Sequence, residues 1–295
     1  MHVVDPAAIA SKYLEASRSA VEELGASPMV AGFIATSDPP SIAYANATRQ
    51  QFSNAGFGYD LRQVKRLELE DAILEANEDP TIHGIFIYFP VFSNQQDDYL
   101  RNLVDFKKDI EAGSLYWTRK LYANDRLAIK GDTTRKALLP CTPLAIVKIL
   151  DEIDEYGSEA RPLREKRVTI FNRSEVIGRP LAVMMSNDGA TVYSFDEFGP
   201  LEFRHAEPFE SEITREEALE KSDIIITGVP SEDFRKVKRN EISSDSVCVN
   251  FSSVKNFEDD IADYVKTFVP RVGPMTVAMC MRNTIRLFKN FHQES

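Results

Sequence analysis

The fold of this chain is decided by a stretch that runs from Arg167 to Pro180 and reads RVTIF-NRSEVIGRP. Residues 167–171 are mostly apolar and predict a buried strand, and a helix is predicted to start near Ser174. Backbone N–H groups and the dipole at a helix start favour a pyrophosphate group. We therefore expect Ser174 to cap the helix or bond a phosphate oxygen, and Arg173 to add positive charge. The stretch predicts a mononucleotide-binding half, but Gly178 is its only glycine, so an ordinary strand-to-helix turn stays the alternative.

A carboxylate stands at the end of the next strand, which is predicted over residues 190–195. Asp196 follows Gly178 by roughly 20 residues, the offset expected of the acid that bonds an adenosine ribose 2′-hydroxyl. A carboxylate there repels a 2′-phosphate, so Asp196 favours NAD over NADP. An exposed aspartate in a turn is the alternative. The third strand, residues 223–227, ends at Gly228, where the missing side chain lets a ligand approach the backbone.

Apolar segments alternate with helical patterns along the rest of the chain. Strands are predicted over residues 29–35, 82–89 and 247–251, and helices over residues 7–25, 41–55, 67–77 and 144–153. Such alternation indicates parallel sheets covered by helices on both faces.

The length of 295 residues favours two domains. We expect a first domain over residues 1–151, with the C-terminal helix 274–295 packing back on it, and a second over residues 152–273. The polar segment 152–165 is the predicted hinge. The acidic stretch 197–222 is expected to be a solvated surface insertion.

Composition and charge disfavour several classes of function. The formal net charge of −11 is unfavourable for nucleic acid, which is bound through clustered lysines and arginines. No apolar run approaches the roughly 20 residues that span a bilayer, so no membrane association is expected. Cys141, Cys248 and Cys280 are widely separated and the four histidines are scattered, which predicts reduced thiols and no metal site. The first residues resemble neither a secretory signal nor a mitochondrial presequence, so a cytoplasmic location is expected.

Five further segments stand out in order along the chain. They are Tyr44 in the helix after Asp38-Pro39, Gly84–Pro90, Lys108-Asp109-Ile110-Glu111, Pro140-Cys141-Thr142-Pro143, and Gly273–Met279 followed by Asn283-Thr284. With the turn at 172–180, this ordered set resembles the methylenetetrahydrofolate dehydrogenase/cyclohydrolase family over nearly the whole chain. The resemblance implies an α/β protein with an N-terminal αβα parallel-sheet domain that binds folate, a C-terminal Rossmann-type dinucleotide-binding domain, and a cleft between them. It also implies a homodimer formed through the second domain.

The departures from the family pattern bear on activity. Bifunctional members carry a lysine four residues after the helix tyrosine, where this chain has Thr48, which has no amine to activate water. A glutamine that supports that lysine is replaced by Tyr88, and the aspartate that closes the Lys-Asp-Val-Asp segment is replaced by Glu111. The chain therefore looks closest to the family's monofunctional, NAD-specific branch, known from yeasts. The segment 270–273 lacks the family's glycine pair and leaves local contacts to cofactor or pterin open.

The resemblance implies NAD-dependent oxidation of 5,10-methylenetetrahydrofolate to 5,10-methenyltetrahydrofolate by direct hydride transfer, within one-carbon metabolism and purine biosynthesis. It implies catalytic roles for Tyr44 and Cys141, and substrate contacts from Tyr44, Tyr88, Glu111 and Pro270. It implies cofactor contacts from Arg173, Ser174, Ile177, Asp196, Glu197, Gly228, Val229, Pro230 and Thr276.

Simpler interpretations of three of these residues stay open. Tyr44 is also explained by core packing, Cys141 by inert packing and Thr276 by helix capping. Hydride transfer needs no covalent nucleophile, which weighs against that role for Cys141. Two other functions are kept as alternatives: a bifunctional dehydrogenase/cyclohydrolase that recruits another base, and a non-catalytic nucleotide-sensing module on the same scaffold.

Overall fold

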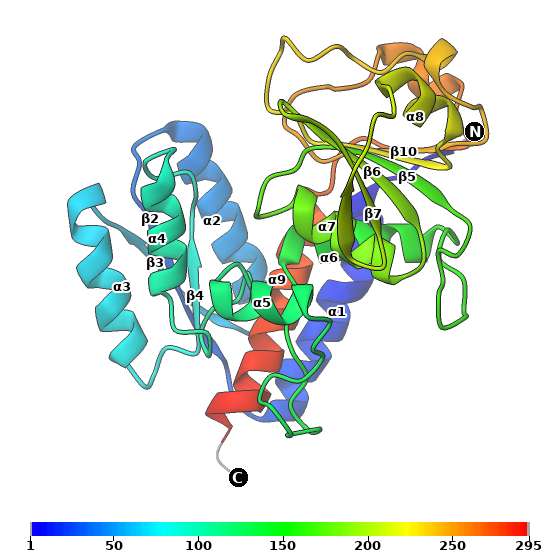
Figure 1. Ribbon diagram of the computed structural model, residues 1–295. Helices are drawn as coiled ribbons and strands as arrows, with labels where there is room; N and C mark the ends of the chain where they lie inside the picture. The colour runs from blue at the N-terminus through cyan, green and yellow to red at the C-terminus, as the bar shows by residue number, and fades with distance from the viewer. Residues whose placement is uncertain (1, 294–295) are drawn as a thin grey trace. The chain divides into compact units, whose positions relative to one another are not determined.

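A computed structural model describes residues 2–293, which fold into two compact α/β units (Figure 1). The eight-stranded unit comprises the chain up to Ala10 and residues 142–276, and the three-stranded unit comprises residues 11–141 and the chain from Val277. Two α/β units with parallel sheets were predicted, and this fold class is confirmed. The division falls at 141/142, inside a helix, whereas the sequence led us to expect it at 151/152.

The sheet of the eight-stranded unit has the order β1-β11-β10-β9-β5-β6-β7-β8. The first six strands in this order, β1, β11, β10, β9, β5 and β6, are parallel, and β7 and β8 extend the sheet as an antiparallel edge. The strands are β1 (His2–Val3), β5 (Arg167–Phe171), β6 (Thr191–Asp196), β7 (Gly199–Arg204), β8 (Glu207–Glu210), β9 (Ile224–Thr227), β10 (Val247–Asn250) and β11 (Thr267–Val269). The helices within this unit are α7 (Gly178–Asn187) and α8 (Arg215–Lys221). The four predicted strands of this region are confirmed, because each is an apolar run buried in the centre of the sheet.

The acidic stretch at 197–222 lies mostly at the surface, as its composition suggested, but it is folded as part of the sheet unit. It contributes β7, β8 and α8, and Phe203 of β7 is fully buried against the core. The turn between β7 and β8 places His205 and Ala206 at positive φ, with Arg204 paired to Glu207. Such two-residue hairpin turns usually carry Asn or Gly, and their absence here hid the hairpin.

The sheet of the three-stranded unit is parallel, with β2 (Met29–Ile34) between β3 (Gly58–Gln63) and β4 (Gly84–Ile87). Its helices include α2 (Pro39–Asn54), α3 (Leu69–Glu78), α4 (Gln95–Leu103) and α5 (Leu115–Tyr122), and the division between units falls within α1 (Pro6–Leu24), α6 (Cys141–Glu152) and α9 (Gly273–Leu287). Asp38 caps α2 through a hydrogen bond from the Ser41 N–H, and Pro39 occupies its first turn. The helix therefore begins at Pro39 and not at Ser41, its predicted start.

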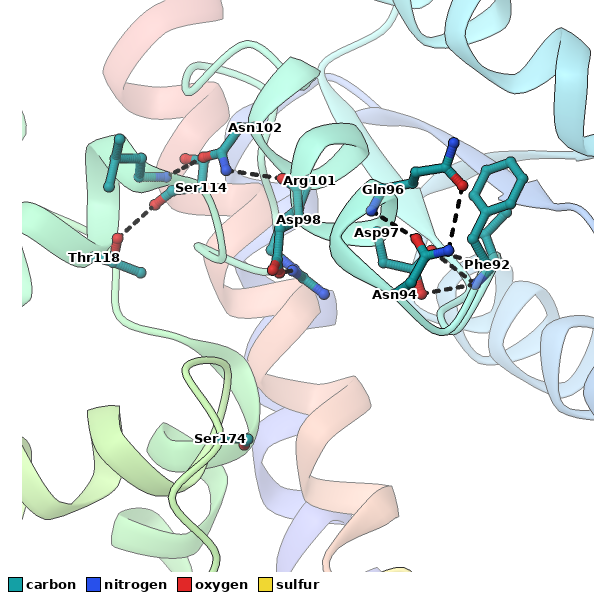
Figure 2. Close-up of polar contacts among 12 residues, drawn as sticks. Phe92, Asn94, Gln96, Asp97, Asp98, Arg101, Asn102, Ser114, Thr118 and Ser174 are labelled. Carbon is teal, nitrogen blue, oxygen red and sulfur yellow. Dashed lines mark hydrogen bonds and ion pairs between the residues drawn. The ribbon is translucent and has the colours of Figure 1, made fainter. Parts of the chain in front are cut away.

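The turn after β4 is held by the buried carboxylate of Asp97. Its oxygens accept hydrogen bonds from the backbone N–H groups of Val91, Phe92 and Ser93, at 3.2, 2.8 and 3.0 Å. Figure 2 shows Asp97 beside Phe92 and beside Asn94, whose side chain caps α4. This turn lies just beyond Tyr88, which is the first residue after the end of β4 at Ile87. Within residues 2–293, no helix has both the length and the apolar character to cross a bilayer.

Candidate active site

The turn between β5 and α7 is organised by the side chain of Asn172. Its Oδ1 accepts hydrogen bonds from the backbone N–H and the hydroxyl of Ser174, at 3.0 and 2.8 Å. Its Nδ2 donates to the carbonyl of Gly228 at 2.9 Å, which ties the turn to the end of β9. The Ser174 hydroxyl in turn accepts from the N–H groups of Ile177 and Gly178, at 3.2 and 3.4 Å. The helix thus begins at Gly178 instead of near Ser174, because the intervening residues form this capped turn.

Two glycines allow the close packing around this turn. A Cβ added to Gly178 would lie 2.0 Å from the Asn172 carbonyl oxygen, so only glycine fits beside that backbone. A Cβ on Gly228 would lie 1.8 Å from the ring of Phe251. The single glycine of the predicted motif is therefore required by helix–turn packing, whereas Gly228 makes room for an aromatic ring.

An ion pair joins the turn to the end of β6. Arg173 pairs with both carboxylate oxygens of Asp196, and its Nε lies 2.8 Å from Oδ2. The same guanidinium donates to the carbonyls of Ser194 and Gly199, at 2.9 and 2.8 Å. Arg173 was expected to add charge to a phosphate site, but its donors are instead committed to Asp196 and the strand ends.

A cavity of about 910 Å³ opens beside this ion pair, at the carboxyl ends of β5 and β6. Its volume lies within the range of about 300–1,000 Å³ typical of small-molecule sites, and open α/β sheets bind ligands at this edge. Six of the nine predicted cofactor residues line it: Arg173, Ser174, Asp196, Glu197, Val229 and Pro230. Ile177, Gly228 and Thr276 do not line it, although the first two hold the turn through backbone groups. Thr276 Oγ1 lies 3.4 Å from Thr142 Oγ1, in the first turn of α9.

The three-stranded unit gathers aromatic side chains around Tyr44. This residue of α2 is 45% exposed, and its ring meets that of Tyr88 edge to face, with centroids 6.0 Å apart. The Tyr88 hydroxyl lies 2.8 Å from the hydroxyl of Tyr59 on β3 and donates to the Ala45 carbonyl at 3.4 Å. Burial raises the pKa of Tyr88 to about 12, so the hydroxyl stays protonated as a hydrogen-bonding group.

Thr48 lies one turn beyond Tyr44 and is almost fully buried. Its hydroxyl donates to the Tyr44 carbonyl at 3.0 Å, a contact within its own helix. Because threonine has neither an amine nor a titratable proton near neutral pH, this position cannot act as a general base. Thr48 and Tyr88 lie close together, and their hydroxyl groups interact.

Glu111 belongs to the same group of residues. Burial, followed by the nearby carboxylate of Asp109, raises the pKa of Glu111 to about 8. The carboxyl group is therefore largely protonated at neutral pH, and it both donates and accepts hydrogen bonds. A group of this kind suits a ligand that presents both donors and acceptors.

Cys141 is the first residue of α6, a helix that begins before residue 144, its predicted start. Its thiol is buried and donates to the Ile110 carbonyl at 3.2 Å, and the Asn283 amide nitrogen lies 3.3 Å from the sulfur. Burial raises the pKa of the Cys141 thiol well above its usual range, with a further contribution from Cys280. A thiol held in this state is a poor nucleophile.

Three residues of these sites were not singled out from the sequence as site residues. Tyr59 lies on β3, a strand too polar to be predicted. Its ring occupies the space that a side chain at position 32 would need, so Gly32 leaves room for it. Asn172 and Asn283 hold backbone carbonyls across long stretches of chain, and no local pattern indicates this. Pro270, a predicted substrate residue, lies at the end of β11 in the eight-stranded unit and lines a separate cavity of about 280 Å³.

Comparisons with known proteins agree with this arrangement. The family described as tetrahydrofolate dehydrogenase/cyclohydrolase matches through its catalytic domain at residues 4–111 and its NAD(P)-binding domain at residues 140–292. A methylenetetrahydrofolate dehydrogenase (NAD+) from Saccharomyces cerevisiae is 40% identical over 282 residues, covering 90% of this chain and 88% of that protein. A protein of the same name from Dictyostelium discoideum is 40% identical over 97% of this chain and 94% of its own. The solved structure of the NAD-dependent 5,10-methylenetetrahydrofolate dehydrogenase from S. cerevisiae superimposes with a TM-score of 0.92 at 37% identity, covering 98% of this chain and 97% of that one.

Proposed function

The chain belongs to the tetrahydrofolate dehydrogenase/cyclohydrolase family, and we propose that it oxidises 5,10-methylenetetrahydrofolate to 5,10-methenyltetrahydrofolate with NAD. The observation that carries this proposal is the carboxylate of Asp196 beside the β5–α7 turn, in a chain about 40% identical to NAD-dependent dehydrogenases. A carboxylate at that strand end accepts hydrogen bonds from a ribose diol and repels a 2′-phosphate.

The dinucleotide site fits NAD on two grounds. The backbone of the turn packs so closely against Gly178 that no side chain fits there. The cavity beside the turn is large enough for part of a dinucleotide. Bound NAD would supply the hydride acceptor. We propose that the cofactor is held by Arg173, Ser174, Ile177, Asp196, Glu197, Gly228, Val229, Pro230 and Thr276.

The residues of the three-stranded unit would bind and orient the folate. The exposed ring of Tyr44 offers an aromatic face to the pterin or aminobenzoyl ring, and Tyr88 supports that ring from its edge. The protonated carboxyl of Glu111 matches the mixed donors and acceptors of a pterin. Cys141, whose S–H donates to the Ile110 carbonyl, would hold the backbone beside the substrate and not act as a thiolate. Pro270 is also proposed as a substrate contact.

Hydride loss from the methylene carbon is driven by the substrate's own nitrogens. The protein must therefore provide orientation of the reactants and exclusion of water.

The absence of a base at Thr48 supports a dehydrogenase without cyclohydrolase activity. The direct test follows NADH absorbance when the full-length protein is mixed with methylenetetrahydrofolate and NAD, and then with NADP in place of NAD. NADH formation with a clear preference for NAD is expected. A second assay supplies methenyltetrahydrofolate and measures its enzyme-dependent hydrolysis. Clear hydrolysis would favour the bifunctional alternative, and no NADH formation would favour a nucleotide-sensing module.

Four further properties belong to the proposal. The three-stranded unit is proposed to bind folate and the eight-stranded unit NAD. A homodimer is proposed, which light scattering on the purified protein can measure. The cytoplasm is proposed as the compartment because all three cysteines are free, as expected where thiols are kept reduced. A role in purine biosynthesis would follow from the one-carbon product, and growth with and without added purine in a deletion strain would test it.

A further inference from the structure

A second cavity, of about 370 Å³, lies in the three-stranded unit, between α5, the segment 123–139 and the later part of α9. We call it the basic cavity, because five of its lining residues are cationic. These residues are Lys120, Arg126, Lys136, Arg282 and Arg286. One carboxylate, Asp125, also lines it. In a chain whose net charge is −11, such a concentration of positive charge calls for an explanation.

Most of this charge has no counter-ion among the described residues. Asp125 pairs with Lys120 at 2.9 Å and also accepts the Leu127 N–H at 3.0 Å, so its oxygens are already committed. Arg126 donates to the neutral side chain of Asn124 at 2.8 Å. Within residues 2–293, Arg126, Lys136, Arg282 and Arg286 form no ion pair.

Arg286 has a structural role that accounts for its position. Its Nη1 donates to the Ala137 carbonyl at 3.1 Å, and it lies in the last turn of α9, where a cation offsets the helix dipole. Arg282, one turn earlier, has no such explanation. Its Nη1 is shielded from solvent and has no hydrogen-bond partner in the described part of the chain. A buried donor without a partner is costly, more so on a charged group.

The two arginines also oppose each other. Burial and then the neighbouring charge of Arg282 lower the pKa of Arg286 to about 10, and burial lowers the pKa of Arg282. Both groups nevertheless stay charged at neutral pH. The helix therefore holds two positive charges one turn apart, partly shielded from water, and an anion between them would offset both costs.

The remaining lining sets the size of the occupant. Leu121, Leu127, Leu138 and Leu139 add apolar walls, and the volume exceeds what one inorganic ion needs. We propose that the basic cavity binds a small organic polyanion, whose phosphate or carboxylate oxygens pair with Arg282 and Arg286. None of the residues that line this cavity is among those proposed to bind NAD or folate, so the proposal does not depend on the enzymatic activity.

The test titrates the full-length protein with pyrophosphate and, separately, with citrate, and measures binding by calorimetry. At least one probe is expected to bind the wild type. Arg282→Met should weaken that binding by roughly 10- to 100-fold, as expected when a charge-assisted hydrogen bond is lost. Binding of pyrophosphate alone would assign the site to phosphates, and binding of citrate alone to carboxylates. Arg282→Met would not affect pyrophosphate that binds at the dinucleotide site. Only the binding that this substitution weakens is therefore assigned to the basic cavity.

Arg119→Met is the matched control, because Arg119 is an exposed residue of the same helix as Lys120 but does not line the basic cavity. It removes the same charge and should change binding by less than about twofold. If Arg282→Met fails to fold, Lys136→Met at the exposed rim of the cavity should still weaken binding. The proposal is overturned if neither probe binds the wild type, or if the cavity variants bind as tightly as Arg119→Met.

Discussion

The β5–α7 turn and the Tyr44–Tyr88 group differ in how their side chains are held. In the turn, Asn172, Ser174 and Gly178 are close neighbours in sequence, and their own hydrogen bonds set the geometry. Around Tyr44, the participating residues come from α2, β3, the end of β4, α6 and α9, and each is placed by the packing of its element; Tyr88 is the residue directly after β4. One site is therefore shaped by local chain geometry, and the other by the tertiary fold. Four predictions test this difference, in order of decreasing expected effect.

The largest effect is expected from Gly178→Ala. The new Cβ would lie 2.0 Å from the Asn172 carbonyl oxygen, so the turn must move away from the helix. We expect a loss of about 1–3 kcal/mol in the free energy of unfolding, as for other overpacked sites, together with weaker NAD binding. Thermal denaturation and calorimetric titration with NAD measure both. Gly273→Ala is the control, since a Cβ there meets nothing within 4 Å. Equal stability of the two variants would show that the turn is not rigidly constrained.

Asp196→Ser should relax the preference for NAD toward NADP. The substitution removes the repulsion of a 2′-phosphate and frees the guanidinium of Arg173, which now pairs with Asp196. A charge-assisted contact to the phosphate predicts a change of roughly 10- to 100-fold in the ratio of kcat/KM values for the two cofactors. Adding Arg173→Ala to the same variant should remove the gain in NADP use. An unchanged ratio in Asp196→Ser would contradict the role given to this strand end.

Glu111→Gln should change how stability depends on pH. The pKa of Glu111 is raised to about 8 in the folded protein, so the folded state favours the protonated form. The stability that this provides is complete below the unfolded-state pKa, near 4.5, and is lost as pH rises to about 8. The glutamine variant keeps a neutral side chain and should be more stable than the wild type by about 1–2 kcal/mol at pH 9, with little difference near pH 4.

Urea denaturation at the two pH values measures this difference. Glu68→Gln serves as the control, because hydrogen bonding to Lys65 lowers the pKa of Glu68, the opposite direction. That variant should gain no stability at high pH. Equal stability of Glu111→Gln and the wild type at pH 9 would mean that the carboxyl group is solvated when charged.

The smallest effect is expected from Tyr59→Phe. Loss of the hydroxyl removes the 2.8 Å contact that holds Tyr88, while the ring still fills the space beside Gly32. We expect kcat/KM to fall by roughly fivefold, close to 1 kcal/mol for one neutral hydrogen bond. Tyr99→Phe, whose exposed hydroxyl contacts Glu70 at 2.7 Å, should leave kcat/KM unchanged. Equal activity of both variants would mean that Tyr88 is held by packing alone.

The elements that were predicted correctly share one physical feature. They are the apolar runs at 167–171, 190–195, 223–227 and 247–251, which lie in the middle of the eight-stranded sheet. Strands buried on both faces are apolar throughout, so their composition predicts them. Two of the elements that were missed are polar. β3 reads GYDLRQ and lies at the edge of its sheet, while α4 carries a cap and charges but few apolar residues. Such elements are stabilised by pairing and capping, which composition does not report.

The α/β class, the turn at 172–180, the acid at Asp196 and the missing amine at Thr48 can all be predicted from the amino-acid sequence, because each depends on residue type and short spacing. The folded chain was needed to find that Arg173 pairs with Asp196, that Tyr59 supports Tyr88, and that Arg282 and Arg286 face a basic cavity. Those contacts join residues that are distant in sequence or lie on separate elements. They exist because hydrophobic packing brings the elements together, and buried polar groups must then find partners among whatever side chains meet there.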